Sequence, residues 1–462
     1  MNNSEISFDL DLVSRYGGRG PRYTSYPTAI QFDESYTATH YAANAASSNT
    51  AGLPLSLYVH VPFCDTLCYY CACNKIVTRN AARVTNYLQC LHREIELQAE
   101  LFDDQRLVEQ LHFGGGTPTY LDEAQLAKLL SRLRSAFCFD GSDDREFSIE
   151  VDPRTVDKDR IAELAELGFN RLSLGIQDFD PKVQAAVNRQ QSADDVLMLM
   201  IDARHVGFKS ISFDLIYGLP HQSPDSFDQT LELVIGMQPD RLAVYNYAHL
   251  PNRFKGQRMI NAADIPLPET KLEILRHTIE QLLDAGYEYV GMDHFALPGD
   301  DLVEAKNDGT LQRNFQGYST HRQCDLVGLG VSAISSVGTE YAQNAHTTAD
   351  YEAMIRAGNL AIRKGIAVDR DDRIRAAVIQ SLMCYDSVRF SDINSRYNID
   401  FRRYFESELE RLLPLVADDL VHVTPDGIYV RPKGRLLLRS IAMLFDRYIE
   451  QSSNNTRYSK TV

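Results

Sequence analysis

Four cysteines, Cys64, Cys68, Cys71 and Cys73, lie within ten residues of one another, directly after the apolar run SLYVHVPF. Thiolates are soft, strongly donating ligands that suit iron–sulfur clusters and zinc. Structural zinc normally takes a fourth ligand from a second Cys or His pair. No such pair is visible, because the other cysteines are isolated: Cys90, Cys138, Cys324 and Cys384. Three thiolates on a cubane would leave one iron open to a ligand, whereas zinc and metal-free thiols remain as alternatives.

The elements that position this loop are predicted by the hydrophobic pattern, which alternates β-rich runs with amphipathic helical ones from about residue 53. Such alternation is typical of a parallel α/β sheet. The predicted strands cover residues 56–63, 108–113, 146–151, 170–176, 210–218 and 241–248, with a further edge strand at 287–295. The predicted helices cover residues 81–101, 121–137, 157–167, 193–205, 224–236 and 268–284.

Unusual residues stand at or just past the carboxyl ends of these six strands. They are Cys64, the run Gly114–Gly116, Glu150, Gln177, Asp214 and Ala248. In parallel barrels and open α/β sheets the loops at this edge converge, and ligands bind there. The sequence therefore predicts one site on one rim of the sheet.

Two flanking regions lack the strand–helix repeat, which predicts three parts: an N-terminal arm (1–52), a catalytic domain (53–365) and a smaller C-terminal domain (366–462). Gly and Pro in the segment 17–29 disfavour a regular element there. The C-terminal domain is predicted to be mostly helical, with helices at 371–384, 401–415 and from about 434, and a β-hairpin at 421–430. A winged nucleic-acid-binding module has a similar element order, but this region is nearly neutral in charge.

The charge balance is acidic, with 47 Lys and Arg against 63 Asp and Glu and a formal net charge of −16 over 462 residues. This opposes nucleic-acid binding, which depends on basic side chains neutralising phosphates. No run approaches the ~18 apolar residues that span a bilayer, and VLMLMI (196–201) is interpreted as part of a buried helix. We expect no secretory signal, no membrane association, a cytoplasmic location and a monomer. Reduced thiols, rather than disulfides, fit that compartment.

The cysteine loop, YVHVPFCDTLCYYCAC, resembles the cluster loop of the radical S-adenosylmethionine (SAM) superfamily. The resemblance implies a partial (β/α)6-type parallel barrel and a [4Fe–4S] cluster with three cysteine ligands, Cys64, Cys68 and Cys71. In that superfamily the open iron chelates SAM, and an electron from the cluster cleaves SAM to methionine and a 5′-deoxyadenosyl radical. The segment GGGTPTYL (114–121) resembles the superfamily's Gly-rich strand end, where backbone approaches the methionyl group.

Cys73 and the N-terminal segment PRYTSYPTA (21–29) make the chain similar to one family in particular, the oxygen-independent coproporphyrinogen III oxidases. Further matching motifs include IEVDPR, GFNRLSLGIQDF, FDLIYGLP, YNYAHLP, GMDHFA and GVSAIS. The resemblance implies that two propionates of a porphyrinogen become vinyl groups in haem biosynthesis, with an unidentified reductant and an unidentified electron acceptor. The alternatives are a related haem-binding chaperone, which lacks the fourth cysteine and the PRYTSYP segment, and an RNA-modifying radical SAM enzyme, which the acidity opposes.

The same resemblance implies two bound SAM molecules and assigns residues to each. Positions around the cluster-bound SAM match Tyr58, Gly115, Glu150 and Ile334. Positions around the second SAM match Tyr70, Gly116, Thr117, Gln177, Arg189, Asp214 and Ala248. Carboxylates and amides of this kind accept hydrogen bonds from ribose hydroxyls, and an arginine pairs with a methionyl carboxylate. Each polar residue taken alone is also compatible with an ordinary strand end.

A substrate rich in carboxylates requires local cations in an otherwise acidic chain. Arg22, with Arg19, is the candidate because guanidinium pairs bidentately with carboxylate, and Tyr23 and Tyr26 are candidates to cover the macrocycle. The alternative is an arm that packs on the domain for stability. The histidines in or beside the strands lack paired metal-ligand spacing, so we expect them to be hydrogen-bonded structural residues: His60, His112, His249 and His294.

Overall fold

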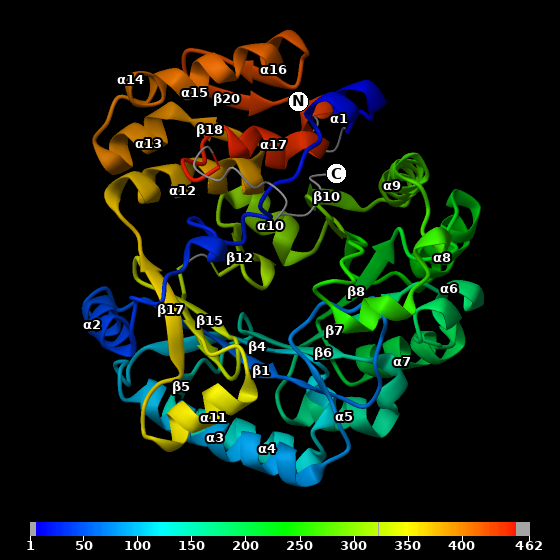
Figure 1. Ribbon diagram of the computed structural model, residues 1–462, viewed down its shortest axis with the longest axis vertical. Helices are drawn as coiled ribbons and strands as arrows, with labels where there is room; N and C mark the ends of the chain where they lie inside the picture. The colour runs from blue at the N-terminus through cyan, green and yellow to red at the C-terminus, as the bar shows by residue number, and fades with distance from the viewer. Residues whose placement is uncertain (1–5, 322, 450–462) are drawn as a thin grey trace. The chain divides into compact units, whose positions relative to one another are not determined.

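The computed structural model describes residues 6–321 and 323–449, and the chain divides into two compact units (Figure 1). Unit 1 comprises Met1–Gln31, Leu282–Arg322 and Val368–Val462, and unit 2 comprises Phe32–Gln281 and Gln323–Ala367. The segment 1–52, predicted as one arm, is thus divided at Gln31. Residues 282–322, predicted as part of the catalytic domain, belong to the same unit as the C-terminal region.

Unit 2 is built on six parallel strands that neighbour one another in chain order. They are β1 (Leu55–Val61), β4 (Leu107–Gly115), β6 (Glu146–Val151), β7 (Arg171–Gln177), β8 (Ser210–Tyr217) and β9 (Arg241–Asn246). Strands covered on both faces are apolar along much of their length, which is why the sequence pattern located them. The partial (β/α)6 arrangement expected from the resemblance is confirmed.

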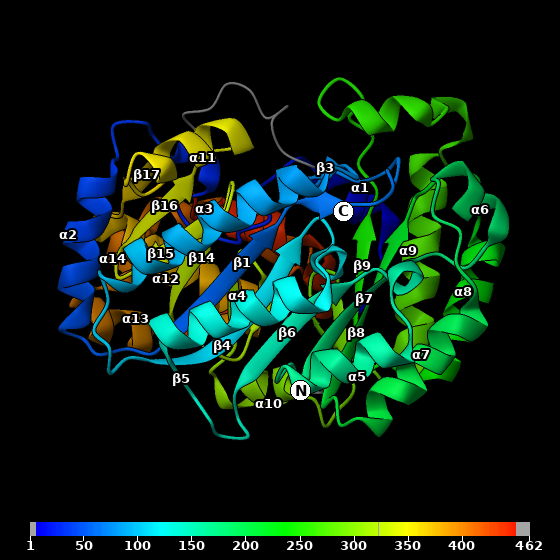
Figure 2. The ribbon, with the colours of Figure 1, turned by 90° about the horizontal axis from the view of Figure 1, so that it is seen from below.

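Helices connect these strands, and Figures 1 and 2 show α3, α4, α5, α7 and α8 side by side along one face of the sheet. The helices are α3 (Ala81–Ala99), α4 (Glu123–Ala136), α5 (Lys158–Glu166), α6 (Pro181–Ala186), α7 (Ala193–His205), α8 (Pro224–Met237) and α9 (Pro268–Asp284). Asn80, Asp122 and Asp157 cap the first three, because each side chain accepts a backbone N–H of the first turn. On α7 only one face is buried: Val196 is covered, but Met198 and Ile201 are exposed, so the interpretation of 196–201 as wholly buried was wrong.

The sheet of unit 2 continues beyond β1 through strands that the sequence analysis did not predict. β14 (Asp325–Leu329) pairs parallel to β1, and β15 (Ile334–Val337), β16 (Glu340–Asn344) and β17 (Ile362–Ala367) follow as antiparallel neighbours. Short β5 (Cys138–Phe139) pairs with β4. Two further helices belong to unit 2, α2 (Ala38–Asn49) and α11 (Thr348–Arg356).

Unit 1 combines short helices with small antiparallel sheets around its own apolar core. The predicted hairpin is present as β19 (Val421–Val423) and β20 (Gly427–Val430), and β18 (Ser387–Arg389) completes a three-stranded sheet. Before it stands α12 (Arg370–Tyr385), followed by α13 (Phe390–Tyr397). The helix predicted at 401–415 is broken into α14 (Phe401–Tyr404), α15 (Glu406–Arg411) and α16 (Leu413–Ala417), with Phe405 in a non-helical conformation and Pro414 in the first turn of α16.

The remaining elements of unit 1 come from three parts of the chain: α1 (Leu10–Tyr16), β10 (Glu288–Gly291), β11 (His294–Ala296), α10 (Asp301–Asp308), β12 (Gln312–Asn314), β13 (Gly317–Ser319) and α17 (Leu438–Met443). The segment 17–28 contains no helix or strand, as its Gly and Pro content predicted. Among the residues that the structure describes, no helix is long and apolar enough to cross a membrane.

Candidate active site

The cysteine loop begins at the carboxyl end of β1, where the sequence predicted it. Short β2 (Phe63–Cys64) pairs parallel to β3 (Ile76–Val77) and so closes the loop at its base. Cys64 and Cys68 are buried, Cys71 is partly buried, and Cys73 is exposed. All four thiols are free. The loop thus presents three covered thiols and one outer neighbour.

Each of the three inner thiols has a hydrogen-bond donor of its own. Thr117 Oγ1 lies 3.5 Å from Cys64 Sγ, and a guanidinium nitrogen from each of Arg154 and Arg189 lies 3.4 Å from Cys68 Sγ. A hydrogen bond from Cys73 lowers the pKa of Cys71 to about 6, although burial opposes this shift. Burial raises the pKa of Cys64 to about 11. Donors and cations of this kind stabilise thiolates that carry an anionic iron–sulfur cluster.

The donor set fits a cubane better than a single metal ion. Within residues 6–321 and 323–449, no three His, Cys, Asp or Glu side chains are arranged to hold one metal ion. A cubane instead places each thiolate on a different iron, so its ligands need not converge on one point. Cys64, Cys68 and Cys71, on one loop and with separate donors, satisfy that requirement.

Side chains from two segments outside the strands, Gln257 and Asn188, bond the backbone of the loop. Gln257 is buried, and its amide donates to the carbonyl oxygen of Tyr70, at 2.9 Å, and to that of Ala248, at 3.2 Å. Asn188 donates to the carbonyl oxygen of Leu67 at 2.8 Å. Gln257 was missed by the sequence analysis because it lies in a short 3₁₀ helix (Lys255–Met259), outside any predicted strand end.

The Gly-rich end of β4 lies against the same loop. Gly115 has φ +118°, and a Cβ there would come within 2.7 Å of the His60 ring. A Cβ on Gly116 would come within 2.7 Å of the carbonyl of Pro62, and the Thr117 N–H donates to the Phe63 carbonyl oxygen at 2.8 Å. Only glycine permits this close approach of the β4 end to the base of the cysteine loop.

Two carboxylates lie within β6 and β8, Glu150 and Asp214, and their pKa values shift in opposite directions. Desolvation opposes the charged form of Glu150, but hydrogen bonds from His112 and from the Gly115 N–H prevail and lower its pKa. Desolvation and the charge of Glu150 raise the pKa of Asp214 to about 7, and Ser173 donates to Asp214 at 3.1 Å. Glu150, whose pKa is lowered, can therefore accept hydrogen bonds from ligand hydroxyls as a carboxylate. Asp214, whose pKa is raised, can accept such bonds and, when protonated, can also donate one.

The other residues implied by the resemblance lie on the same unit. Gln177 ends β7 with φ +68°, a left-handed conformation that non-glycine residues adopt at a cost and that clusters at ligand sites. Arg189 is buried and donates to the Gly175 carbonyl oxygen and, at 3.1 Å, to Asp152. Tyr58 stacks on His112 with ring centroids 5.8 Å apart. Ile334 opens β15, where its backbone lies close to Gly328.

The four predicted substrate residues lie on unit 1. Arg19 is exposed, and Arg22, 36% exposed, pairs with Asp293. Tyr23 and Tyr26 are 2% and 4% exposed in the core of unit 1. The Tyr23 hydroxyl donates to Asp446 at 3.0 Å, and that of Tyr26 accepts the Arg447 N–H at 3.1 Å. Burial of both rings favours the alternative of a segment packed for stability, whereas the two arginines remain accessible cations.

The histidines behave as predicted where their bonds are described. His60 bonds the Tyr58 hydroxyl at 3.0 Å and the Asn74 carbonyl oxygen at 2.9 Å. His112 lies 2.5 Å from Ser148 Oγ and 3.2 Å from Glu150, and His249 lies 2.9 Å from the Tyr247 hydroxyl. Such bonds fix the ring positions without a metal.

Comparison with known proteins identifies the family. Residues 58–234 match the model of the radical SAM superfamily. The oxygen-independent coproporphyrinogen III oxidase of Pseudomonas aeruginosa is 52% identical over 457 residues, which is 99% of each chain. The chain belongs to the oxygen-independent coproporphyrinogen III oxidase family.

Other members of the oxidase family agree along the whole length. The Escherichia coli oxygen-independent coproporphyrinogen III oxidase is 47% identical over 462 residues, all of both chains. The solved structure of the E. coli coproporphyrinogen III oxidase (HemN), described as a radical SAM enzyme, has a TM-score of 0.92 and 48% identity, and covers 96% of this chain and 100% of its own. Residues 368–437 match the HemN C-terminal domain. Family membership implies a [4Fe–4S] cluster and SAM as cofactors.

Proposed function

We propose that this chain is an enzyme that decarboxylates two propionate side chains of coproporphyrinogen III oxidatively, giving protoporphyrinogen IX in haem biosynthesis. For each propionate, one hydrogen atom leaves the β-carbon, the C–CO₂ bond breaks, and one electron passes to an acceptor. The products are a vinyl group and CO₂. The observation that carries the proposal is the three-cysteine loop at the carboxyl rim of six parallel strands, in a chain that matches coproporphyrinogen III oxidases from end to end.

Cys64, Cys68 and Cys71 are proposed as the ligands of the [4Fe–4S] cluster. When bound, the cluster and SAM supply a 5′-deoxyadenosyl radical, which removes the hydrogen atom. The separate donors to the inner thiols support this ligand set, and the exposed Cys73 is proposed as a neighbour that does not ligate. The protein's own task is to position the β-carbon and to exclude water and side reactions.

Two SAM molecules are proposed, held by the rim residues assigned by family resemblance. The methionyl groups are proposed to contact the Gly115–Gly116 backbone, and Glu150 and Asp214 are proposed to accept hydrogen bonds from ribose hydroxyls. The buried Arg189 pairs with a methionyl carboxylate of the second molecule. The cluster-bound SAM is proposed to contact Tyr58 and Ile334 as well. The second SAM is proposed to contact Tyr70, Thr117, Gln177 and Ala248.

Substrate carboxylates are proposed to bind Arg19, which is exposed, and Arg22, which is half-buried and would exchange its pair with Asp293 for a substrate carboxylate. The buried Tyr23 and Tyr26 support these contacts by fixing the segment that carries Arg22, and a macrocycle contact of their own would require that segment to move. A reductant for the cluster and an acceptor for the product electrons are required by the balance of the reaction. We further propose a cytoplasmic monomer that binds neither nucleic acid nor membranes.

The proposed function is tested by anaerobic reconstitution with iron and sulfide, followed by SAM, a reductant and coproporphyrinogen III. Protoporphyrinogen should form, with two CO₂ released per product. An intact cluster that yields no product, together with tight stoichiometric haem binding, would overturn the proposal in favour of a haem-binding chaperone.

A further inference from the structure

Cys68 differs from the other inner thiols because two guanidinium groups donate to its sulfur. Arg189 is already engaged in the proposed function as the partner of a methionyl carboxylate. Arg154 has no role there, yet its Nη2 lies 3.4 Å from Cys68 Sγ and 3.2 Å from Thr66 Oγ1. Cys68 thus has a second cation beside it, and both arginines also pair with Asp152.

The position of Arg154 is fixed by the turn that follows β6. Asp152 accepts the Arg154 backbone N–H at 3.1 Å and two of its side-chain N–H groups, at 3.0 Å from Nε and 2.7 Å from Nη2. Pro153 restricts the backbone between them. Asp152 and Arg154 are only 10% and 19% exposed, so solvent screens their charges incompletely. Asp152 therefore holds the Arg154 guanidinium through Nε and Nη2, and the same Nη2 lies beside Cys68 Sγ.

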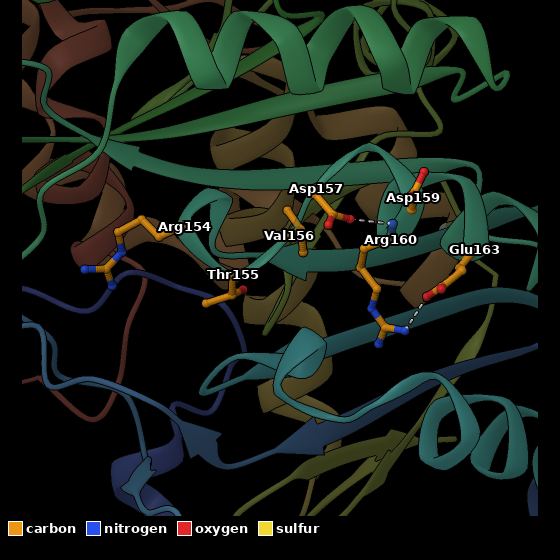
Figure 3. A pocket seen from close by; sticks show the side chains of 7 residues that line it. All are labelled: Arg154, Thr155, Val156, Asp157, Asp159, Arg160 and Glu163. Carbon is orange, nitrogen blue, oxygen red and sulfur yellow. Dashed lines mark hydrogen bonds and ion pairs between the residues drawn. The ribbon is translucent and has the colours of Figure 1, made fainter.

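Arg154 also lines a surface depression (Figure 3). Its lining includes Arg160 and Glu163, and the Arg154 guanidinium points away from both. Arg160 directs its own guanidinium to Glu163, at 2.8 Å, and to the Leu121 carbonyl oxygen, at 2.6 Å. Two arginines thus line one depression, but only Arg154 contacts a cysteine of the loop.

We propose that Arg154 is a positioning residue that sets the reduction potential of the cluster through its hydrogen bond and charge on Cys68. This inference rests on the proposed function, which supplies the cluster. Hydrogen bonds to cluster sulfurs and nearby charge are the protein's main means of tuning such potentials. A cluster gains negative charge on reduction, so a fixed cation that also donates to a ligand sulfur stabilises the reduced form. Guanidinium remains charged throughout the accessible pH range.

The alternative is that Arg154 only stabilises the turn after β6. That role predicts changes in folding or in cluster content, but no systematic change in potential among variants that retain the cluster. Asp152 separates the two explanations further, because its carboxylate opposes the charge of Arg154. Neutralising Asp152 and neutralising Arg154 should shift the potential in opposite directions.

The test is an EPR-monitored redox titration of the reconstituted full-length protein in the absence of SAM. Arg154→Gln should shift the midpoint potential to more negative values, Arg154→Lys should restore part of the shift, and Asp152→Asn should shift it to less negative values. Arg160→Gln, at the same depression, should leave it unchanged. Iron and sulfide contents and circular dichroism establish that each variant holds a cluster and is folded.

An unchanged potential in Arg154→Gln, with full cluster content, would overturn the inference. If that variant assembles no cluster, Arg154→Lys, which keeps the charge but loses the guanidinium contact with Cys68, takes its place, and a potential equal to that of the wild type there would also overturn the inference. Failure of the wild-type protein to assemble a cluster would instead contradict the proposed function, so the two failures are distinguishable.

Discussion

At the scale of single residues, the neighbouring thiols of Cys71 and Cys73 differ in exposure and in pKa. Cys71 is partly covered and has its pKa lowered to about 6 by the hydrogen bond from Cys73, against the effect of burial. Cys73 is exposed and lies two residues after Cys71, the last cysteine of the CxxxCxxC motif. A low pKa favours the thiolate, which is the form that binds iron. These environments support Cys71 as a ligand and Cys73 as its neighbour.

The Cys71→Ser and Cys73→Ser variants test this assignment. We expect Cys71→Ser to lose nearly all reconstituted iron and sulfide, because an alcohol is a poor substitute for a soft thiolate. Cys73→Ser should retain the cluster. Iron and sulfide analysis with EPR of the reduced protein gives the answer, and loss of the cluster in both variants would show that the ligand set is incomplete.

Arg22, which is half-buried and paired with Asp293, lies on the segment that the sequence singled out for substrate contact. Arg22→Gln should raise KM for coproporphyrinogen III by about tenfold, since charge-assisted hydrogen bonds contribute about 1.5–3 kcal/mol. Arg15→Gln is a matched control on the same segment, because exposed Arg15 pairs with Asp418. The measurement is steady-state kinetics on wild-type and variant preparations of equal iron content. Equal KM values in the two variants would remove Arg22 from the substrate site.

At the scale of elements, the site depends on the close approach of the β4 end to the cysteine loop. Gly116→Ala would place a Cβ 2.7 Å from the Pro62 carbonyl, where backbone rather than a flexible side chain must move. We expect a loss of about 1–3 kcal/mol in stability, and reduced SAM binding, from this overpacking. Gly141→Ala, where a Cβ meets nothing within 4 Å, is the control. Thermal unfolding and SAM titration of both variants provide the measurement. Equal stability and equal SAM affinity of the two variants would contradict the close contact between Gly116 and the Pro62 carbonyl.

Glu94 shows how a helix is tied to the strands beyond β1. It is fully buried on α3 and accepts hydrogen bonds from the Gly330 N–H at 2.6 Å, Asn344 at 2.6 Å and Tyr351 at 2.7 Å. Burial raises its pKa to about 7, although these three bonds oppose the shift. The folded protein therefore binds this proton more tightly than the unfolded chain does.

The free energy of unfolding should accordingly fall as pH rises from about 4.5 to about 7. At about 1.4 kcal/mol per pKa unit, the Glu94 contribution is on the order of 3 kcal/mol. Glu94→Gln should flatten this part of the profile, whereas Glu96→Gln, at a partly exposed position of the same helix, should not. Urea denaturation at several pH values measures the slopes; parallel profiles for wild type and Glu94→Gln would contradict the assignment.

The sequence predicted those elements whose residues carry strong local signals. The six strands were located by apolar runs, and their helices by amphipathic spacing. By contrast, β14–β17 lie in a stretch of short strands without a helical repeat, and the break of 401–415 depends on the conformation of Phe405. At the site, cysteines and glycines were recognisable from spacing. Gln257 and Arg154 were not assigned, because their roles arise from hydrogen bonds between distant parts of the chain.

At the scale of the whole molecule, an acidic chain acts on an acidic substrate. The formal net charge is −16, so attraction of a tetracarboxylate must come from a few placed arginines rather than from a general field. At the cysteine loop, too, the positive charge comes from a few placed arginines, because Arg154 and Arg189 lie beside Cys68. The similarity to coproporphyrinogen III oxidases covers the residues of both units.

The central claim is that the chain removes a hydrogen atom from the β-carbon of each reacting propionate. The direct measurement uses coproporphyrinogen III deuterated at the β-carbons of its propionates, with reconstituted protein, SAM and a reductant under anaerobic conditions. Mass spectrometry should find one deuterium in 5′-deoxyadenosine for every propionate converted to a vinyl group. Formation of protoporphyrinogen with unlabelled 5′-deoxyadenosine would contradict the account.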